Sequence, residues 1–213
     1  MSRGKSALVL GATGLVGRSL VRQLLVDPRY ESVTCLVRRP IPYAMFNDGL
    51  RRLNTVVINF EELEAYQGYF NVDHIYCCLG TTIKKAGTQA RFRKVDFEYI
   101  HVAAQLARAQ RCNGFVWISA VGANANSKNF YLRVKGELEN AIMRMPQLGH
   151  AAAVRPSLLL GERHDSDSRP LETLGQIIAP VLGVLLVGPL KKYKPVTAVE
   201  VAHKMVRLQK FDE

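Results

Sequence analysis

The sequence contains few acidic side chains and few cysteines, and both shortages narrow what the protein can be. Eighteen Asp and Glu residues stand against 29 Lys and Arg residues, which gives a formal net charge of +11 at pH 7. The cysteines are Cys35, Cys77, Cys78 and Cys112, and they lack the spacing of metal ligands. We therefore expect no metal site, and we expect the four thiols to be reduced core residues of a cytoplasmic protein.

The chain has no long basic tract, and few of its aromatic residues, which make up 8% of the chain, are interleaved with the basic groups. The basic residues lie in short groups spread along the chain, such as Arg51-Arg52 and Lys191-Lys192. Proteins that bind nucleic acid combine a concentrated basic surface with stacking aromatic side chains, so nucleic-acid binding is not expected. A positive field that attracts a phosphorylated small molecule is enough to explain the charge.

Charge is absent from one stretch, residues 173–190, which approaches the length of a membrane span. Pro180, Pro189 and three glycines interrupt it, so we do not expect stable membrane insertion. Two alternatives remain, a broken helix packed over a pocket and an apolar patch buried in a homodimer. No signal peptide is expected either, because only a short apolar run follows the first five residues.

Three glycines spaced three residues apart, Gly11, Gly14 and Gly17, lie between an apolar run at residues 7–10 and an amphipathic stretch at 15–26. The pattern predicts a buried strand, a glycine turn and a helix, which is how a doubly wound sheet holds a dinucleotide pyrophosphate. Glycine lets phosphate approach the main chain, and the helix N-terminus offers it unpaired N–H groups. We expect the cofactor to contact Gly11, Thr13, Gly14, Leu15, Val16 and Gly17.

Strand and helix patterns alternate along the rest of the chain. We expect strands at residues 7–10, 32–37, 55–59, 74–78, 114–119 and 151–154, and helices at 15–26, 97–110 and 130–145, with a shorter one near 61–66. Asn113-Gly114 is expected to close the helix at 97–110. This alternation predicts a single α/β domain over residues 1–213, a doubly wound parallel sheet with helices on both faces. Residues 157–195 would add a small extension on the substrate side.

The second strand is followed by Arg38 and Arg39 and by no acidic residue. In dinucleotide-binding folds an acid at this place accepts the ribose 2′-hydroxyl of NAD, whereas arginine accommodates the 2′-phosphate of NADP. We therefore expect NADP(H) to be preferred over NAD(H), with both arginines at the 2′-phosphate. The alternative is that both arginines only face solvent.

Two further strand ends offer weaker indications. Asn59 and Phe60 follow the third strand, where a polar group could meet adenine. Leu79, Gly80 and Thr81 follow the fourth strand, and Gly80 permits a second close approach of the backbone to the cofactor. The adjacent Cys77-Cys78 pair could supply a catalytic thiol, but no His stands in a recognisable arrangement with it, and buried structural cysteines are favoured.

The fifth strand delivers Ser119 at its carboxyl end, where ligands bind in open α/β sheets. Tyr131 and Lys135 lie one turn apart on the following helix and share a face. A phenol is a poor proton donor or acceptor at neutral pH, and a nearby ammonium favours its ionised form. These three residues therefore predict a proton-transfer site, with Ser119 orienting a substrate oxygen.

The glycine pattern, Ser119, Tyr131-x-x-x-Lys135 and Arg155-Pro156-Ser157 together resemble the short-chain dehydrogenase/reductase superfamily of Rossmann-type proteins, in particular its atypical members on the extended, epimerase-like branch. Residues 77–82 and 131–137 are similar to the Tat-interacting-protein oxidoreductase subgroup, and residues 195–202 to the family's closing segment. The resemblance extends over nearly the whole chain.

The resemblance implies roles for these residues. Tyr131 would be the acid/base, Lys135 would bind the nicotinamide ribose and tune Tyr131, and Ser119 would position the carbonyl. Arg155, Pro156 and Ser157 would border the nicotinamide. Where the family often has asparagine, at the start of the helix after the fourth strand, this chain has Val95-Asp96, which speaks against a proton relay through that helix.

Two classes of function remain open. The first is an NADPH-dependent oxidoreductase that reduces a small, hydrophobic carbonyl compound. The second is an NADP(H)-binding regulatory or redox-sensing protein with little turnover, since some members of this branch bind NADP without known turnover. The presence of Ser119, Tyr131 and Lys135 together favours the enzyme.

Overall fold

A computed structural model describes residues 4–46, 48–49, 51–160 and 194–211 of the 213-residue chain. The apolar stretch at residues 173–190, for which we expect a pocket wall or a dimer contact, lies outside the described residues. So does most of the extension expected at residues 157–195.

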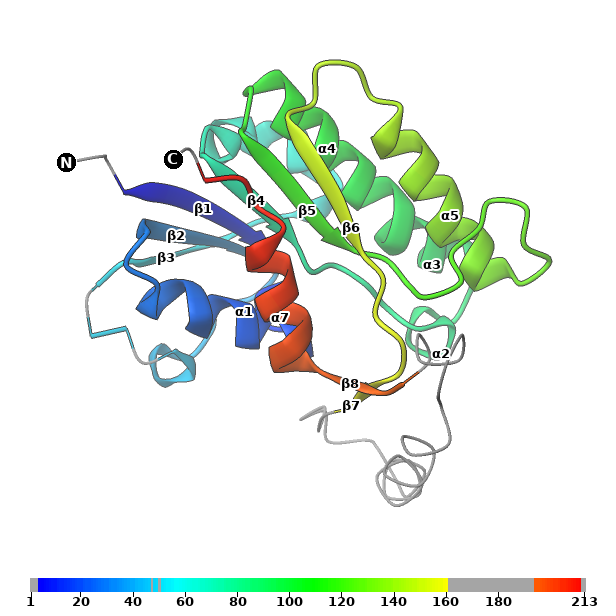
Figure 1. The fold of residues 1–213 in the computed structure, drawn as a ribbon, viewed down its shortest axis with the longest axis horizontal. Coiled ribbons are helices and arrows are strands. Elements are labelled where there is room, and N and C mark those ends of the chain that lie inside the picture. Colours follow the sequence, from blue (N-terminus) through cyan, green and yellow to red (C-terminus); the bar gives the residue numbers. More distant parts are fainter. Residues whose placement is uncertain (1–3, 47, 50, 161–193, 212–213) are drawn as a thin grey trace.

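Six parallel strands form the central sheet, in the order β3-β2-β1-β4-β5-β6 (Figure 1). All six lie within two residues of the expected bounds, and the doubly wound sheet is confirmed. The order reverses direction between β1 and β4, and ligands of such sheets bind in the crevice at that point. The strands are β1 Lys5–Leu10, β2 Tyr30–Val37, β3 Leu53–Val57, β4 His74–Cys77, β5 Gly114–Ile118 and β6 His150–Val154.

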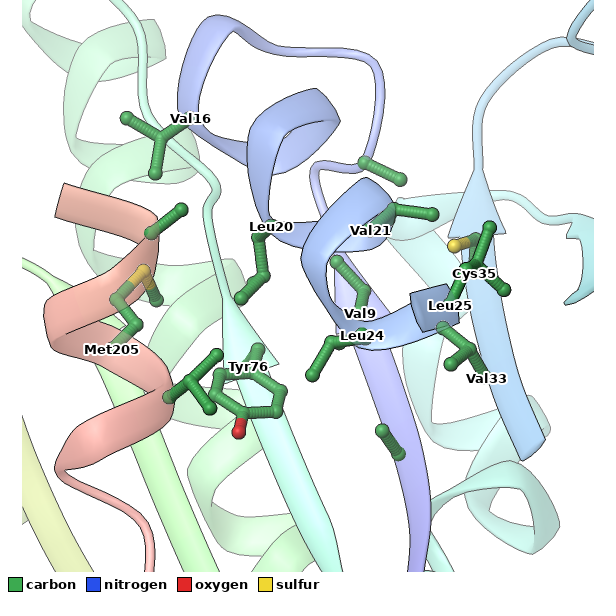
Figure 2. Close-up of a cluster of buried hydrophobic side chains, with 14 of the residues drawn as sticks. Val9, Val16, Leu20, Val21, Leu24, Leu25, Val33, Cys35, Tyr76 and Met205 are labelled. Atoms are coloured by element: carbon green, nitrogen blue, oxygen red, sulfur yellow. The ribbon is translucent and has the colours of Figure 1, made fainter. Parts of the chain in front are cut away.

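Helices α1 (Leu15–Val26) and α7 (Ala198–Arg207) cover one face of the sheet and pack on each other (Figure 1). The apolar positions of α1 recur at helical spacing, so Leu20, Val21 and Leu24 are all fully buried. Figure 2 shows these side chains against Val9 of β1 and Tyr76 of β4, with Met205 of α7 closing the cluster. This packing fixes α1 against the sheet, and with it the turn that joins β1 to α1.

The opposite face is covered by the 3₁₀ segment η2 (Phe60–Phe70) and by helices α4 (Tyr99–Ala109) and α5 (Phe130–Met143). Strand side chains alternate between the two faces, so Leu8, Ile75 and Trp117 point into this second core. Val134, Leu138 and Ile142 of α5 are buried, as the apolar stripe of the sequence predicts. Helix α5 is thereby fixed on the sheet beside β5 and β6.

One expectation about this layer is wrong. The helix expected at residues 97–110 starts earlier, because α3 (Gln89–Arg93), a π-helical turn η3 (Lys94–Glu98) and α4 follow one another with helical backbone angles at each junction. It also ends differently, because Arg111, with φ 55°, takes the left-handed position and Gly114 opens β5. The π turn adds a residue to the helical repeat, and this turn contains Asp96.

Short elements complete the described chain: η1 (Tyr43–Met45), α2 (Ile83–Ala86), and a two-stranded parallel sheet of β7 (Leu159–Leu160) and β8 (Val196–Thr197). After α7 the chain crosses the amino ends of the large sheet. There His74 Nε2 lies 2.9 Å from the Lys210 carbonyl oxygen, and His150 Nε2 lies 2.7 Å from that of Leu208. These two contacts fix the α7 end to β4 and β6.

Candidate cofactor and active site

The turn after β1 approaches the end of β4 directly. Gly11 has φ +81°, and a Cβ atom there would lie 2.7 Å from the backbone carbon of Cys78, so only glycine fits. The Gly14 N–H donates to the Gly11 carbonyl at 3.0 Å and closes the turn. Thr13 and Gly14 are exposed at its tip. The turn therefore leaves bare main chain at the switch point of the sheet.

Helix α1 begins at this turn with its N-terminus uncapped. Its N-cap residue is Gly14, which has no side chain to accept a hydrogen bond, and its first turn contains no acidic residue. Leu15 and Val16 thus start a helix whose unpaired N–H groups and positive dipole end favour an anion. Arg18 donates to the Thr13 carbonyl at 3.0 Å and adds a cation beside the turn. These residues fit a dinucleotide pyrophosphate.

Arg38 and Arg39 follow β2 at the same edge of the sheet, and both are exposed. They follow the strand next to β1, so their backbone lies at the same sheet edge as the glycine turn. The expected contact with a 2′-phosphate stays a prediction.

Asn59 and Phe60 follow β3, and contacts with neighbouring groups hold both side chains in place. The Asn59 side-chain oxygen accepts the Glu61 N–H at 3.1 Å and caps η2. The Phe60 ring is buried and packs on Tyr99, with ring centroids 5.8 Å apart. The expected adenine contact remains a prediction. The side-chain amide nitrogen of Asn59 would make it, because the side-chain oxygen already accepts a hydrogen bond.

The end of β4 carries two thiols and a loop. Burial raises the pKa of Cys77 to about 12 and raises that of Cys78 well above its ordinary value. Such thiols stay protonated at neutral pH, which supports the structural role over a nucleophilic one. Leu79 is half-buried, Gly80 is exposed, and the Thr81 N–H donates to Asp96 Oδ2 at 2.8 Å. The loop is therefore tied to the π turn.

Ser119 lies directly after β5 and is 2% exposed. Its N–H donates to the Val154 carbonyl of β6 at 2.7 Å, which fixes its backbone. Its hydroxyl is buried and has no hydrogen-bond partner among the described residues. Because buried hydroxyls are nearly always paired, this one fits a hydrogen bond to a bound ligand.

Tyr131 and Lys135 lie in the first two turns of α5, which Asn129 caps by accepting the Leu132 N–H at 3.1 Å. The ring of Tyr131 is half-buried and contacts Phe92 of α3, with centroids 5.6 Å apart. Lys135 reaches back to the sheet, where its Nζ lies 3.5 Å from the Ile118 carbonyl oxygen. The structure thus brings Lys135 beside the end of β5 that carries Ser119.

Lys135 also forms an ion pair that the sequence analysis missed. Its Nζ lies 2.8 Å from Asp96 Oδ1, and the two side chains are 3% and 1% exposed. Burial raises the pKa of Asp96, and the Lys135 ammonium and the Thr81 N–H oppose that rise by favouring the carboxylate. In the sequence, Asp96 stands out only as a departure from the asparagine that the family often has there, and nothing in the sequence indicates its partner.

Arg155, Pro156 and Ser157 leave the end of β6 with their polar groups engaged. Arg155 Nε donates to Glu139 of α5 at 2.9 Å, and the ion pair raises the pKa of the guanidinium. The Pro156 carbonyl accepts the Val121 N–H at 2.9 Å, and the Ser157 hydroxyl donates to the Lys194 carbonyl. The expected contacts with nicotinamide stay a prediction. Because the Arg155 and Ser157 side chains already bond within the protein, backbone atoms of this segment would make those contacts.

The strand order, the glycine turn and the uncapped helix define a Rossmann-type NAD(P)-binding protein. The sequence model of a family described as NAD(P)H-binding matches residues 11–157. Protein HTATIP2 of Rattus norvegicus is 34% identical over 175 residues, covering 82% of this chain and 70% of that protein. Protein FMP52, mitochondrial, of Candida albicans is 34% identical over 179 residues, covering 84% and 75%.

Solved structures share the fold at low identity. A UDP-N-acetylglucosamine 4-epimerase from Methanobrevibacter ruminantium matches with a TM-score of 0.71 at 13% identity, over 96% of this chain and 73% of the epimerase. The PhqB reductase domain from Penicillium fellutanum matches with a TM-score of 0.69 at 17% identity, over 100% and 66%. The chain belongs to the NAD(P)H-binding family, as an atypical short-chain dehydrogenase/reductase related to HTATIP2 and FMP52.

Proposed function

We propose that the protein is an NADP(H)-dependent oxidoreductase that reduces a small, hydrophobic carbonyl compound. One observation carries the proposal. Lys135 reaches from α5 to the carboxyl end of β5, 3.5 Å from the Ile118 carbonyl oxygen. The next residue is Ser119, whose buried hydroxyl has no partner in the part of the chain that the structure describes. That end of the sheet is where the glycine turn after β1 would hold a dinucleotide.

The residues divide the chemistry as follows. Bound NADPH would supply the hydride, and the turn at Gly11 with Arg38 and Arg39 would hold its phosphates. The Ser119 hydroxyl would donate a hydrogen bond to the substrate carbonyl oxygen and orient it. The Tyr131 hydroxyl would donate the proton that this oxygen takes up, and Lys135 would hold the ribose and favour the ionised phenol left behind.

A Tyr131→Phe variant tests the proposal. NADPH affinity is measured by calorimetry, and NADPH consumption is then screened over aldehydes, ketones and quinones. The variant is expected to bind NADPH as the wild type does and to lose turnover, because it keeps the ring that packs on Phe92 and lacks the hydroxyl. Tyr69→Phe, on the exposed side of η2, is the matched control and is expected to keep full turnover.

Two outcomes would contradict the enzyme. Full turnover in Tyr131→Phe would remove Tyr131 from the mechanism. Tight NADPH binding with no turnover on any carbonyl class would favour the second candidate, an NADP(H)-sensing regulatory protein. The observation in favour of that candidate is the ion pair of Lys135 with Asp96, because it already engages the ammonium that would otherwise hold the ribose.

A cytoplasmic location is part of the proposal. The four free thiols suit a reducing compartment. Within the described residues no helix has both the length and the hydropathy to cross a bilayer. The fungal relatives carry the word mitochondrial in their names, so fractionation of cells into cytosol and mitochondria decides between the two compartments.

A further inference from the structure

The π-helical turn η3 contributes one acidic side chain to the interior. Asp96 is 1% exposed, whereas Glu98 in the same turn is exposed to solvent. π turns are rare and often lie at functional sites, because the extra residue redirects a side chain. Burying a carboxylate is costly unless other groups pair with it, so its partners show what the turn achieves.

The two carboxylate oxygens of Asp96 serve different elements. Oδ2 accepts the N–H of Thr81, in the loop that follows β4. Oδ1 lies 2.8 Å from Nζ of Lys135, on α5. The first partner belongs to the loop expected to face the cofactor, and the second to the pair expected to transfer the proton. Asp96 therefore connects the two halves of the candidate site through one rigid group.

The carboxylate also changes the electrostatics around Tyr131. A lone buried ammonium at Lys135 would favour the phenolate of Tyr131, one helical turn away, and the Asp96 carboxylate offsets that effect. The other charged groups on the elements around Tyr131 are partly exposed or already paired: Arg91 and Arg93 on α3, Arg133 and Glu137 on α5, where Glu137 forms an ion pair with Arg93 and lies 4.0 Å from Arg133. The Cys77 thiol near the pair stays neutral.

We propose that Asp96 is a positioning residue that fixes Lys135 and the Thr81 loop in one arrangement and, by balancing the Lys135 charge, keeps Tyr131 protonated to a higher pH. This role rests on the proposed function, in which Tyr131 is the proton donor. A protonated phenol is the form that reduction of a carbonyl requires, so the balanced pair suits a reductase that works at neutral pH.

The test is the titration of Tyr131 in Asp96→Asn. Asparagine keeps the size of the side chain and an oxygen for the Thr81 N–H, but it lacks the charge. With the ammonium unbalanced, the titration midpoint of Tyr131 is expected to fall by about one to two pH units. Carbon-13-labelled tyrosine reports the midpoint by NMR in the complex with NADP⁺, and the signal missing from Tyr131→Phe identifies the residue.

Two further variants serve as controls for the Tyr131 titration. Glu137→Gln removes a carboxylate of α5 that pairs with Arg93 at the surface. The titration midpoint of Tyr131 in this variant is expected to stay near the wild-type value, because solvent screens the charge of Glu137. Asp96→Ala loses both contacts and is expected to weaken NADPH binding as well. An unchanged midpoint in Asp96→Asn would overturn the charge-balancing role.

If Asp96→Asn does not fold, a measurement on the wild-type protein still tests whether Asp96 balances the charge of Lys135. The side-chain carbon-13 signal of Asp96 is expected to be that of a carboxylate at neutral pH. A protonated carboxyl there would overturn the inference, because it could not balance Lys135. Neither NMR measurement needs a substrate, so failure of the inference is distinguishable from failure of the proposed function, which Tyr131→Phe turnover alone decides.

Discussion

Gly17 lies in direct contact with the carbonyl oxygen of Gly11. A Cβ atom on Gly17 would be 2.1 Å from that oxygen, well inside any tolerated separation. The contact means that the first turn of α1 packs on the backbone of the phosphate turn itself. The geometry of the turn and the position of the helix are therefore set together.

Gly17→Ala is expected to displace the turn and lower the affinity for NADPH at least tenfold. Overpacking of this kind costs about 1–3 kcal/mol of unfolding free energy. Gly68→Ala is the control, because a Cβ atom on Gly68 meets nothing within 4 Å. Calorimetric binding and denaturant unfolding measure the two effects. An alanine variant that binds NADPH as well as the wild type would show that the turn does not hold the phosphates.

NADPH is expected to bind more tightly than NADH, and an Arg38→Ala, Arg39→Ala double variant is expected to remove the difference. Losing a charge-assisted contact with the 2′-phosphate should cost about 1.5–3 kcal/mol. Arg144→Ala is a matched control, because Arg144 is exposed at the far end of α5. Titration with both cofactors provides the measurement. Equal affinities in the wild type would refute the assignment of the two arginines.

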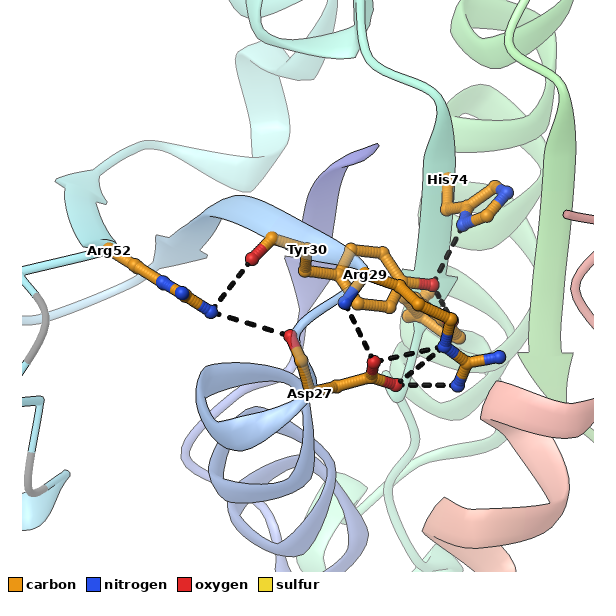
Figure 3. A network of polar contacts seen from close by, with 6 residues as sticks. Asp27, Arg29, Tyr30, Arg52 and His74 are labelled. Carbon is orange, nitrogen blue, oxygen red and sulfur yellow. Dashed lines mark hydrogen bonds and ion pairs between the residues drawn. The ribbon is translucent and has the colours of Figure 1, made fainter. Parts of the chain in front are cut away.

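Tyr30→Phe is expected to destabilise the fold without touching the cofactor site. Figure 3 shows the Tyr30 hydroxyl directed at His74, with its oxygen 2.7 Å from Nδ1, and it also lies 2.6 Å from the Tyr76 hydroxyl. All three side chains are fully buried, so the variant removes one hydrogen bond from His74 Nδ1 and one from the Tyr76 hydroxyl, at a cost of about 1–3 kcal/mol. Denaturant unfolding should detect this loss, while NADPH affinity stays unchanged. A neutral effect would mean that water replaces the hydroxyl.

Asp73 is expected to make stability depend on acid pH. Its burial favours the neutral form, but the N–H and hydroxyl of Ser6 donate to it at 2.8 and 2.7 Å, Lys5 lies 3.6 Å away, and its pKa is lowered overall. A lowered pKa in the folded state adds stability above the ordinary value near 4, and this is lost as the pH falls through the folded value.

Asp73→Asn is therefore expected to be less stable than the wild type at neutral pH and to lose less stability on acidification. Denaturant unfolding at several pH values between neutrality and about pH 3 follows the difference between the two proteins. Glu64→Gln, on the exposed surface of η2, should match the wild type throughout. Parallel curves for Asp73→Asn and the wild type would exclude this carboxylate as the source.

The fold was predictable because its signals are local. Apolar runs of strand length and the 3.6-residue spacing of α1 and α5 do not depend on distant partners, so their positions agree with the structure. Helix α7 was not predicted as a helix. Its segment was identified only through the resemblance to the family, although Thr197 and Glu200 form a capping box at its start.

The candidate site was predictable only in part. Ser119, Tyr131 and Lys135 follow from their places at a strand end and on a helix face. The partner of Lys135 does not, because Asp96 becomes its neighbour only through the π turn, which has no local sequence signal. The pairing of Arg155 with Glu139 escaped for the same reason, since it joins β6 to α5 across space.

The packing of α7 on α1 has a consequence for folding during synthesis on the ribosome. The face of the sheet that carries α1 needs a helix synthesised long after it, because residues 198–207 complete the cluster around Leu20 and Tyr76. Contacts between such distant segments form late and slow folding. During synthesis, the face of the sheet that carries α1 therefore stays partly uncovered until residues 198–207 have left the ribosomal exit tunnel.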